Sequence, residues 1–343
     1  MSDIKISIIL PSYNSEKYLQ QCIDSFVEQK HEAKELIIVD AKSKDSSHQI
    51  IKSFANKYPN IIWVQEPDIN VTDGFNIGLK YATGDFIGFL SSDAIYYTDD
   101  IFTSINSSYK KIKFDCVYFN AYSYYTEDSR KSITLRNCNF EFTRDNFLRH
   151  MCFVPFENIL FRKDIFSKYK LDPNYNMASD IEFYLRILEN RMLGFFIDKV
   201  STVNIYDGEN LSMAFPQKQW DQWLMVDIKG LFDSEIVPES DFQIHKQLIQ
   251  NSYTLSKKYV NDVEQWLLSL IAANQRVSFY NDGVFKDKYA PYWYDLLLKS
   301  QRFGLWAYFK YTRSPLSKSV LQVPIRKKVK FLYQCTVGNI RKR

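Results

Sequence analysis

The first ninety residues repeat a pattern in which short, continuously apolar runs alternate with longer segments whose apolar residues recur every three or four positions. The apolar runs occupy residues 6–11, 35–40, 61–68 and 86–93. Continuous apolar runs of this length are typical of strands that are buried on both faces of a parallel sheet. The pattern therefore predicts four parallel strands joined by helices.

The segments between these runs have the periodicity of amphipathic helices. We expect a first helix capped by Ser15, a second over residues 45–58 and a third over residues 73–82. Pro59 would end the second, and Gly84 would follow the third. The inward faces of the first two would carry Leu19, Cys22, Ile23, Phe26 and Val27, and Ile50, Ile51 and Phe54. The repeated alternation of strands and helices indicates right-handed crossover connections. We therefore expect an α/β fold with a mostly parallel sheet flanked by helices.

The pattern changes after residue 113. Aromatic, roughly alternating runs over 114–142 suggest antiparallel strands, and a strand near 158–162 is followed by a short helix. A helix over 180–189 and a long strand-like run after it would complete the sheet domain near residue 212. Beyond Pro216 the periodicity is helical. We therefore expect a sheet domain over 1–214 and a helical C-terminal region over 215–343.

Composition indicates a folded protein without a membrane span. Hydrophobic residues make up 45% of the 343 residues and aromatic residues 16%. No stretch approaches the roughly 20 apolar residues that cross a bilayer, and the N-terminus lacks the pattern of a signal peptide. The five cysteines lie far apart without a CxxC pair, which favours reduced thiols and a cytoplasmic location.

Charge is divided unevenly along the chain. After Asp295 there are twelve lysines and arginines and no acidic residue, so the preceding residues carry a net charge of −8 against +4 for the whole chain. Basic residues beside aromatic ones in this tail favour attachment to the inner, anionic face of the cytoplasmic membrane. A solvated helix packed on the body is the alternative. Nucleic-acid binding is disfavoured, because no recognition module surrounds the charge.

Three acids follow the predicted strands. Asp40, Asp68 and Asp93 lie at or after carboxyl ends, where ligands bind in open α/β sheets. Neither a GxGxxG loop nor a GxxxxGK[ST] loop is present to hold phosphates. Phosphates can instead be held by a divalent cation that is bound by a carboxylate. Mg²⁺ and Mn²⁺ prefer oxygen ligands and bind diphosphate readily. Asp93 is the candidate ligand, although an aspartate there could instead cap a helix.

Five segments, in order, resemble the family-two glycosyltransferases, and most of all their bacterial polysaccharide-assembly branch. They are ISIILPSYNSEKYLQQCIDSF, ELIIVDAKSKDSS, EPDINVTDGFNIGLKYATGD, FIGFLSSD and NILFRKDIFSKYKLDPNYNMASDIEFYLRIL. The resemblance covers about residues 4–212. It implies a GT-A fold, with a Rossmann-like nucleotide-binding half. It also implies a metal-dependent inverting transferase, of hexosyltransferase type, that moves a sugar from a nucleotide-diphosphate sugar to another molecule.

The resemblance also implies roles for individual residues. The loop under the nucleotide would be formed by Pro11, Ser12 and Tyr13, and Asp40 would accept a hydrogen bond from the base, most simply uracil. Asp68 and Asp73 would lie near the ribose and diphosphate, with Ser92 also on the donor side. Asp93 would bind Mg²⁺ or Mn²⁺, and Asp180 would be the general base. Helix N-termini favour carboxylates, so we expect Asp180 to be ionised there.

Several positions depart from the family pattern. Ala41 follows Asp40, Ser91 stands for the first acid of the Asp-x-Asp motif, and Ala94 follows Asp93. Phe156 and Glu157 occupy a region where histidines are common. Asp207 and Glu209 lie where another histidine is expected, and each is either a substitute metal ligand or a loop cap. Glu182 is expected on a solvated face.

Two functions from different classes follow. The first is an enzyme that glycosylates a saccharide or polyprenyl-linked acceptor during assembly of O-antigen, capsule or exopolysaccharide. The second is a catalytically impaired relative that acts as a binding or scaffolding subunit, which the departures at residues 41, 91 and 94 motivate. A nucleotidyltransferase is disfavoured, because the glycine-rich basic loop expected after the first strand is missing.

Overall fold

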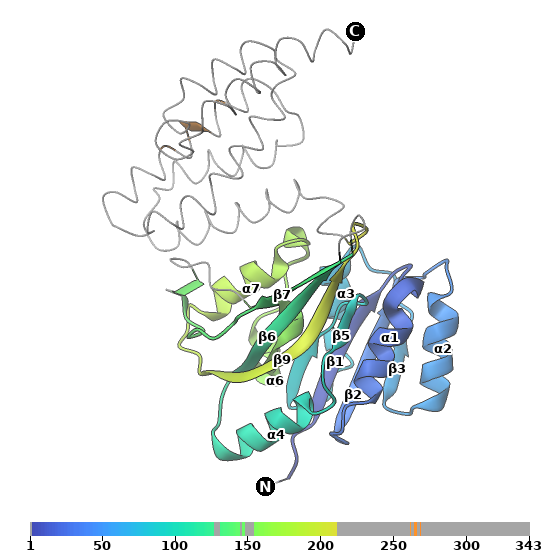
Figure 1. Cartoon of the computed structure of the whole chain (residues 1–343), viewed down its shortest axis with the longest axis horizontal. Helices are drawn as coiled ribbons and strands as arrows, with labels where there is room; N and C mark the ends of the chain where they lie inside the picture. Colours follow the sequence, from blue (N-terminus) through green and yellow to red (C-terminus); the bar gives the residue numbers. More distant parts are fainter. Residues whose placement is uncertain are drawn as a thin grey trace. The chain divides into compact units, whose positions relative to one another are not determined.

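The computed structural model describes residues 2–126, 131–144, 146–147 and 154–210, and the isolated positions 261, 264, 265 and 268 further along. The chain forms two compact units, of which the first comprises Met1–Phe147 and Cys152–Gln219. A single mixed sheet with flanking helices makes up the described part of this unit (Figure 1). The expected boundary between 214 and 215 lies outside the described residues, as do the helical region and the basic tail.

One half of the sheet is parallel, as the sequence pattern predicts. Its strands run in the order β3-β2-β1-β4, and β1 pairs with β2 from Ile6 opposite Lys34 to Ser12 opposite Asp40. The strands are β1 (Ile6–Ser12), β2 (Lys34–Asp40), β3 (Ile61–Val64) and β4 (Phe86–Phe89), and the helices between them are α1 (Glu16–Val27), α2 (Ser47–Lys57) and α3 (Val71–Leu79).

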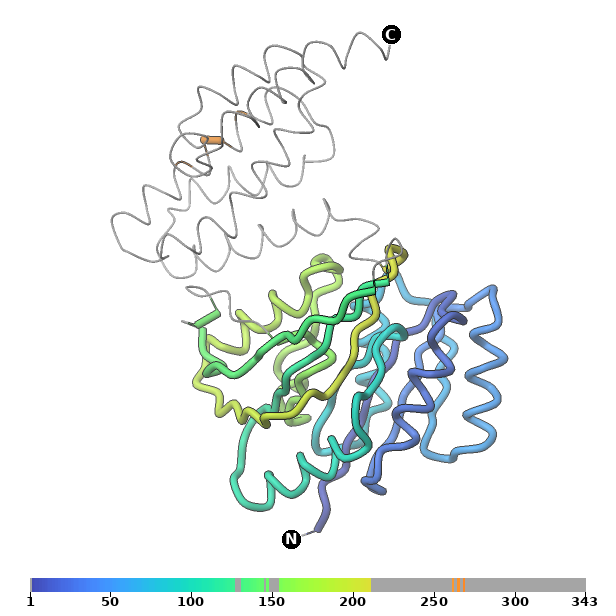
Figure 2. The backbone as a smooth tube through the Cα atoms, in the orientation of Figure 1, coloured from blue at the N-terminus to red at the C-terminus, as the bar shows by residue number. Residues whose placement is uncertain are grey.

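The helices cover both faces of this half. Ile6, Ile8 and Leu10 join one buried cluster with the inward residues of α1. The alternate residues Ile9 and Pro11 face α3, whose Gly78 and Gly74 lie against them. Because successive side chains of a strand point to opposite faces, α1 and α3 lie on opposite sides of β1. The tube in Figure 2 follows the same crossovers.

The other half of the sheet continues in the order β8-β6-β9-β5 with mixed directions, and β7 pairs with β6 at one side. β8 is antiparallel to both β4 and β6, whereas β9 runs parallel to β6. The elements are β5 (Ala94–Tyr96), α4 (Ile101–Lys111), β6 (Cys116–Tyr125), β7 (Ser132–Arg136), η1 (Phe156–Asn158), β8 (Ile159–Arg162), α6 (Lys163–Lys168), η2 (Pro173–Tyr175), α7 (Ser179–Ile187) and β9 (Gly194–Tyr206).

A cluster of aromatic rings joins the two halves. Phe156 in η1 stacks on Phe89 of β4, with ring centroids 4.2 Å apart, and also contacts Phe75 of α3. Phe183 of α7 stacks on Phe166 of α6. Burying rings of this size stabilises the fold by roughly 2–3 kcal/mol each. The cluster therefore holds α3, η1 and α7 in fixed positions around the end of β4.

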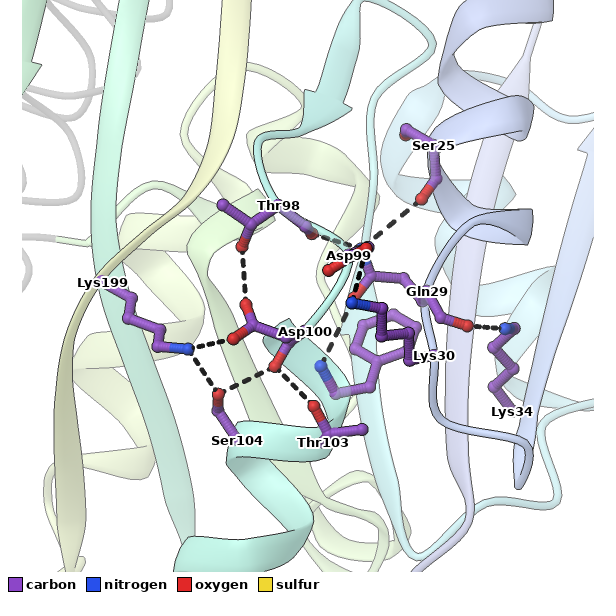
Figure 3. Close-up of polar contacts among 11 residues, drawn as sticks. Ser25, Gln29, Lys30, Lys34, Thr98, Asp99, Asp100, Thr103, Ser104 and Lys199 are labelled. Carbon is purple, nitrogen blue, oxygen red and sulfur yellow. Dashed lines mark hydrogen bonds and ion pairs between the residues drawn. The ribbon is translucent and has the colours of Figure 1, made fainter.

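A polar network ties α1 to the second half of the sheet (Figure 3). Lys199 of β9 donates hydrogen bonds to Asp100 and Ser104 at the start of α4. Gln29, just after α1, donates to the carbonyl of Thr98 at 2.6 Å. Near the end of α1, Lys34 Nζ donates to the carbonyls of Val27 and Gln29, so its charge neutralises the exposed carbonyls there.

The α/β class and the flanking helices are confirmed, as are the buried faces of the first two helices. Ser15 does occupy the N-cap position of α1, but its hydroxyl makes no capping hydrogen bond. Asp45 instead accepts from the backbone N–H of Glu16, and Glu16 accepts from that of Ser46. The starts of α1 and α2 thus cap each other. Among the described residues, no helix is both long and apolar enough to span a bilayer.

Candidate active site

The acids predicted for the donor lie together at the carboxyl ends of the parallel strands. Asp40 ends β2, and Asp68 and Asp73 flank the start of α3. Burial and the nearby charges of Asp73 and Asp40 raise the pKa of Asp68 to about 6. Gly74 allows this approach, since a Cβ there would lie 2.9 Å from Asp68 Oδ2 and 3.0 Å from Pro11 Cβ. The structure thus brings Pro11, Asp40, Asp68 and Asp73 into one region.

The loop after β1 contains a buried hydroxyl without a protein partner. Ser12 is 3% exposed, and its Oγ makes no hydrogen bond, whereas Tyr13 beside it is 58% exposed. A buried hydroxyl without a partner is costly, so such atoms tend to meet a ligand or water. Asp40 Oδ1 accepts from the N–H and hydroxyl of Ser43, which fixes the neighbouring loop. These features fit the expected nucleotide loop.

Asp93 follows β4 and is half-buried, as is Ser92 beside it. The backbone carbonyl of Asp93 accepts from Ile205 N of β9, and its carboxylate accepts from Asn210 Nδ2. Burial and the charge of Glu157 raise the pKa of Asp93 to about 6. Asp93 is therefore fixed at the junction of β4, β5 and the loop after β9.

Glu157 is the residue that connects the predicted metal ligand, Asp93, with the predicted base, Asp180. Its carboxylate accepts a hydrogen bond from the hydroxyl of Ser91, two residues before Asp93. Its charge also raises the pKa values of both Asp93 and Asp180. Because charges act strongly only over short distances in protein, Asp93 and Asp180 lie in the neighbourhood of the same carboxylate.

Asp180 lies in the first turn of α7, where its Oδ1 accepts from the N–H of Ile181 at 2.8 Å. Burial is the main reason that the pKa of Asp180 is raised to about 6, and the charge of Glu157 also raises it. The hydrogen bond from Ile181 and the charge of Arg136 act in the opposite direction. A carboxylate with a pKa nearer to neutrality is a stronger base than an ordinary aspartate. Glu182 is 2% exposed and forms an ion pair with Arg186 at 2.7 Å. The expectation of a solvated face for Glu182 was therefore wrong: it supports α7 from within.

Ion pairs connect the loop after β9 to α1. Lys17 lies 2.5 Å from Asp207 Oδ2 and 3.1 Å from Glu209 Oε2. Asp207 also accepts from the backbone N–H of Glu209, so it is a loop cap as well as an ion-pair partner. Burial opposes the charge of Asp207, but the Lys17 bond and others lower its pKa overall. The same loop presents Asn210 to Asp93.

A side chain of α3 connects the donor region to the segment before α7. Asn70 Oδ1 accepts from the N–H of Asp73 and so caps α3, while Nδ2 donates to the carbonyl of Pro173 at 3.0 Å. Asn76 exchanges two hydrogen bonds with the backbone of Leu171. Hydrogen bonds therefore tie the start of α3 to the turn that leads to Asp180.

The oxygen donors around Asp93 suit a hard divalent cation. The charge of Glu157 opposes the ionisation of Asp93, and a cation would relieve this repulsion. Over the described ranges, no three His, Cys, Asp or Glu side chains are grouped around one metal position. The remaining ligands would come from diphosphate and water. The metal role of Asp93 and the base role of Asp180 stay predictions, as do the assignments of the nucleotide loop.

Three residues of this region were not proposed for the site from the sequence: Glu157, Asn210 and Lys17. Glu157 carried one signal, namely a single carboxylate in front of the buried strand 159–162, where the family commonly has histidine. Asn210 and Lys17 carried none, because their contacts join positions 117 and 190 residues apart.

The model of glycosyl transferase family 2 matches residues 7–170. Glycosyltransferase GlyA of Streptococcus pneumoniae is 32% identical over 110 residues, which cover 32% of this chain and 15% of that protein. The minor teichoic acid biosynthesis protein GgaB of Bacillus subtilis is 28% identical over 196 residues, covering 54% and 21%. Poly(ribitol-phosphate) beta-glucosyltransferase of Bacillus spizizenii is 39% identical over 94 residues, covering 26% and 15%. The chain thus matches at most about a fifth of the length of these relatives.

Solved structures share the fold. The crystal structure of S. aureus TarS 1–349 superposes with a TM-score of 0.56 at 15% identity, covering 99% of this chain and 92% of that one. The same protein in complex with UDP-GlcNAc gives a TM-score of 0.55 at 15% identity, covering 99% and 93%. Residues 7–170 of this chain thus match glycosyl transferase family 2, and the chain shares the GT-A-type fold of TarS.

Proposed function

We propose that this protein is a metal-dependent, inverting glycosyltransferase of the hexosyltransferase type. Its donor is a nucleotide-diphosphate sugar, with UDP as the nucleotide. Its acceptor is a saccharide or a polyprenyl-linked saccharide, in the assembly of a bacterial surface polymer such as O-antigen, capsule, exopolysaccharide or teichoic acid. The observation that carries this proposal is the Glu157 carboxylate, which is bound by the hydroxyl of Ser91 two residues before Asp93 and whose charge raises the pKa of both Asp93 and Asp180.

The donor side is supported by chemistry and by likeness. Ser12 has a buried hydroxyl that lacks a protein partner, Asp40 lies opposite it in the sheet, and the charges of Asp40 and Asp73 act on Asp68. TarS, which shares the fold, has been solved with UDP and with UDP-GlcNAc. Carboxylates can accept hydrogen bonds from a base or ribose, so this cluster suits a nucleoside.

Asp180 would perform the proton transfer. The acceptor oxygen forms a bond to the anomeric carbon as the bond from that carbon to the diphosphate oxygen breaks. The electron pair leaves with the nucleoside diphosphate, and the hydroxyl proton passes to Asp180. Such general-base assistance contributes typically about 10²–10⁴ in rate. The pKa of about 6 leaves Asp180 largely ionised at neutral pH and so ready to accept that proton.

Asp93 would hold Mg²⁺ or Mn²⁺, which supplies positive charge to the departing diphosphate. Asn210 keeps the Asp93 carboxylate oriented, and Asp93 is anchored through its backbone to β9. The names of GgaB and the poly(ribitol-phosphate) beta-glucosyltransferase favour an acceptor in cell-wall polymer assembly. We place the enzyme on the inner face of the cytoplasmic membrane, since a polyprenyl-linked acceptor would be found there.

A screen of nucleotide sugars by thermal shift, with and without Mn²⁺, tests the donor. The correct donor at 100 times its Kd should stabilise the fold by about 2.7 kcal/mol. Transfer by Asp180→Asn should fall by about 10²–10⁴, with donor binding retained. If no nucleotide sugar binds the wild-type protein in either condition, the chain is the non-catalytic binding subunit instead.

A further inference from the structure

We propose that Glu157 is the second carboxylate facing the cation held by Asp93, brought to it from the turn before β8. This inference rests on the proposed function and names a further residue of its metal site. The chain next to Asp93 offers Ser91 and Ala94, which carry no charge. The hydroxyl of Ser91 instead holds the carboxylate of Glu157.

Glu157 is held in place by both of its neighbours. Phe156 stacks on Phe89 with an interplanar angle of 14°. Asn158 is fully buried, and its Nδ2 donates to Ser201 Oγ at 2.6 Å and to Thr202 Oγ1 at 2.9 Å. The turn is therefore anchored to β4 on one side and to β9 on the other. These contacts fix the backbone at Glu157, and the hydroxyl of Ser91 holds its carboxylate.

The two carboxylates have no positive partner in the described part of the protein. No described Lys, Arg or His lies within ion-pair distance of Asp93 or Glu157, and their only side-chain partners are Asn210 and Ser91. Two partly buried like charges without a counter-charge are unfavourable. A divalent cation would supply the missing charge, and carboxylate oxygens are ligands that it prefers.

The acids of the loop after β9 fit this role less well. Asp207 and Glu209 both form ion pairs with Lys17, so their charge is already balanced. Glu209 is exposed, and its side chain is held away by the lysine. Of Glu157, Asp207 and Glu209, Glu157 is the one that forms no ion pair with a described residue.

Binding of Mn²⁺ to the full chain in the presence of UDP tests this inference, measured from the free-Mn²⁺ signal by electron paramagnetic resonance. Glu157→Gln keeps the shape of the side chain and an oxygen that can accept from Ser91. We expect it to raise the Kd for Mn²⁺ at least tenfold while leaving the melting temperature close to that of the wild type. Glu209→Gln, in the loop, and Glu66→Gln, on the surface, should change that Kd less than twofold.

Binding of UDP without metal provides a second measurement, in which Glu157→Gln should not weaken binding as it does for Mn²⁺. Removing a negative charge near the diphosphate should leave metal-free UDP binding unchanged or tighter in Glu157→Gln, whereas misfolding would weaken it. Retention of Mn²⁺ affinity within twofold in Glu157→Gln, with loss in Asp93→Asn, would overturn the role of Glu157 alone. Absence of Mn²⁺ binding by the wild-type protein with UDP would overturn the metal dependence itself, and this inference with it.

Discussion

Three aspartates of the site, Asp68, Asp93 and Asp180, have pKa values raised to about 6, and burial is the largest cause for each. Neighbouring carboxylates add to the effect in all three. Ionised carboxylates held in such surroundings lower the stability of the fold, and the proposed cation binding and proton transfer would use these same groups. At neutral pH these three aspartates therefore lower the stability of the folded state.

The raised pKa of Asp180 predicts that Asp180→Asn gains stability in a pH-dependent way. The folded state holds the proton of Asp180 up to about pH 6, whereas the unfolded chain releases it near pH 4. The wild-type protein therefore loses stability as pH rises from about 4 to about 6, and the variant does not. Above pH 6 we expect the variant to be more stable by on the order of 1–2 kcal/mol, with no difference below pH 4. Urea denaturation at pH 4 and pH 7.5 measures this, and equal differences at both values would contradict it.

Glu157 shows which residues a sequence pattern leaves out. Asp40, Asp68 and Asp93 could be proposed because each follows an apolar run, and parallel strands bring their carboxyl ends to one edge. Glu157 precedes its strand, and that strand is antiparallel to β4. The direction of β8 brings its beginning to the end of β4. A strand direction cannot be read from an apolar run alone, so this neighbour of Asp93 was not proposed.

At the scale of elements, α3 is the helix on which the proposed donor site depends. Its first turn carries Asp73 and Gly74, and its glycines let it approach β1 closely. The pattern predicted this helix over 73–82, and it occupies Val71–Leu79, since Asn70 caps it earlier. The short strand β5 and the helix α4 were not predicted. Residues 94–111 contain no long apolar run, and Asp100, which occupies the N-cap position of α4, was not used as a signal.

Two glycine substitutions in α3 should have different effects, one on binding of the donor and the other on the stability of the core. In Gly74→Ala the new Cβ would press on Asp68 and Pro11, so we expect the KM for the donor to rise about tenfold, equivalent to roughly 1.4 kcal/mol. In Gly78→Ala the Cβ would lie 2.2 Å from Ile9 Cγ2, in the core, at a cost of about 1–3 kcal/mol in stability. Steady-state kinetics and thermal melts distinguish them. A donor KM that rises equally in both variants would mean that α3 shifts as a whole.

At the scale of the whole molecule, charge divides the chain into an acidic body and a tail with twelve basic residues. The tail lies outside the described residues, and membrane attachment is an inference from its sequence. Long-range charge acts on surfaces and association rather than on the fold. The fold class was predictable because its periodicity is local, whereas the partner of the tail depends on surroundings that periodicity does not report.

Vesicle binding tests the tail. Replacing Arg326, Lys327, Lys328 and Lys330 by Gln should weaken binding of the full chain to phosphatidylglycerol vesicles at least tenfold, since each basic residue near lipid contributes about 1 kcal/mol. A variant with four body lysines replaced by Gln serves as the control with equal net charge: Lys52, Lys57, Lys111 and Lys168. Cosedimentation measures both. Equal loss in the two variants would show that net charge, and not the tail, governs attachment.

The double use of Asn70 has a consequence for how such domains can be recombined. One amide side chain caps the helix of the donor region and also holds the turn at Pro173, about a hundred residues later. A chimera that takes its first half from one relative and its second half from another would separate these partners. Fragments exchanged between family members should therefore carry both ends of this contact from a single parent.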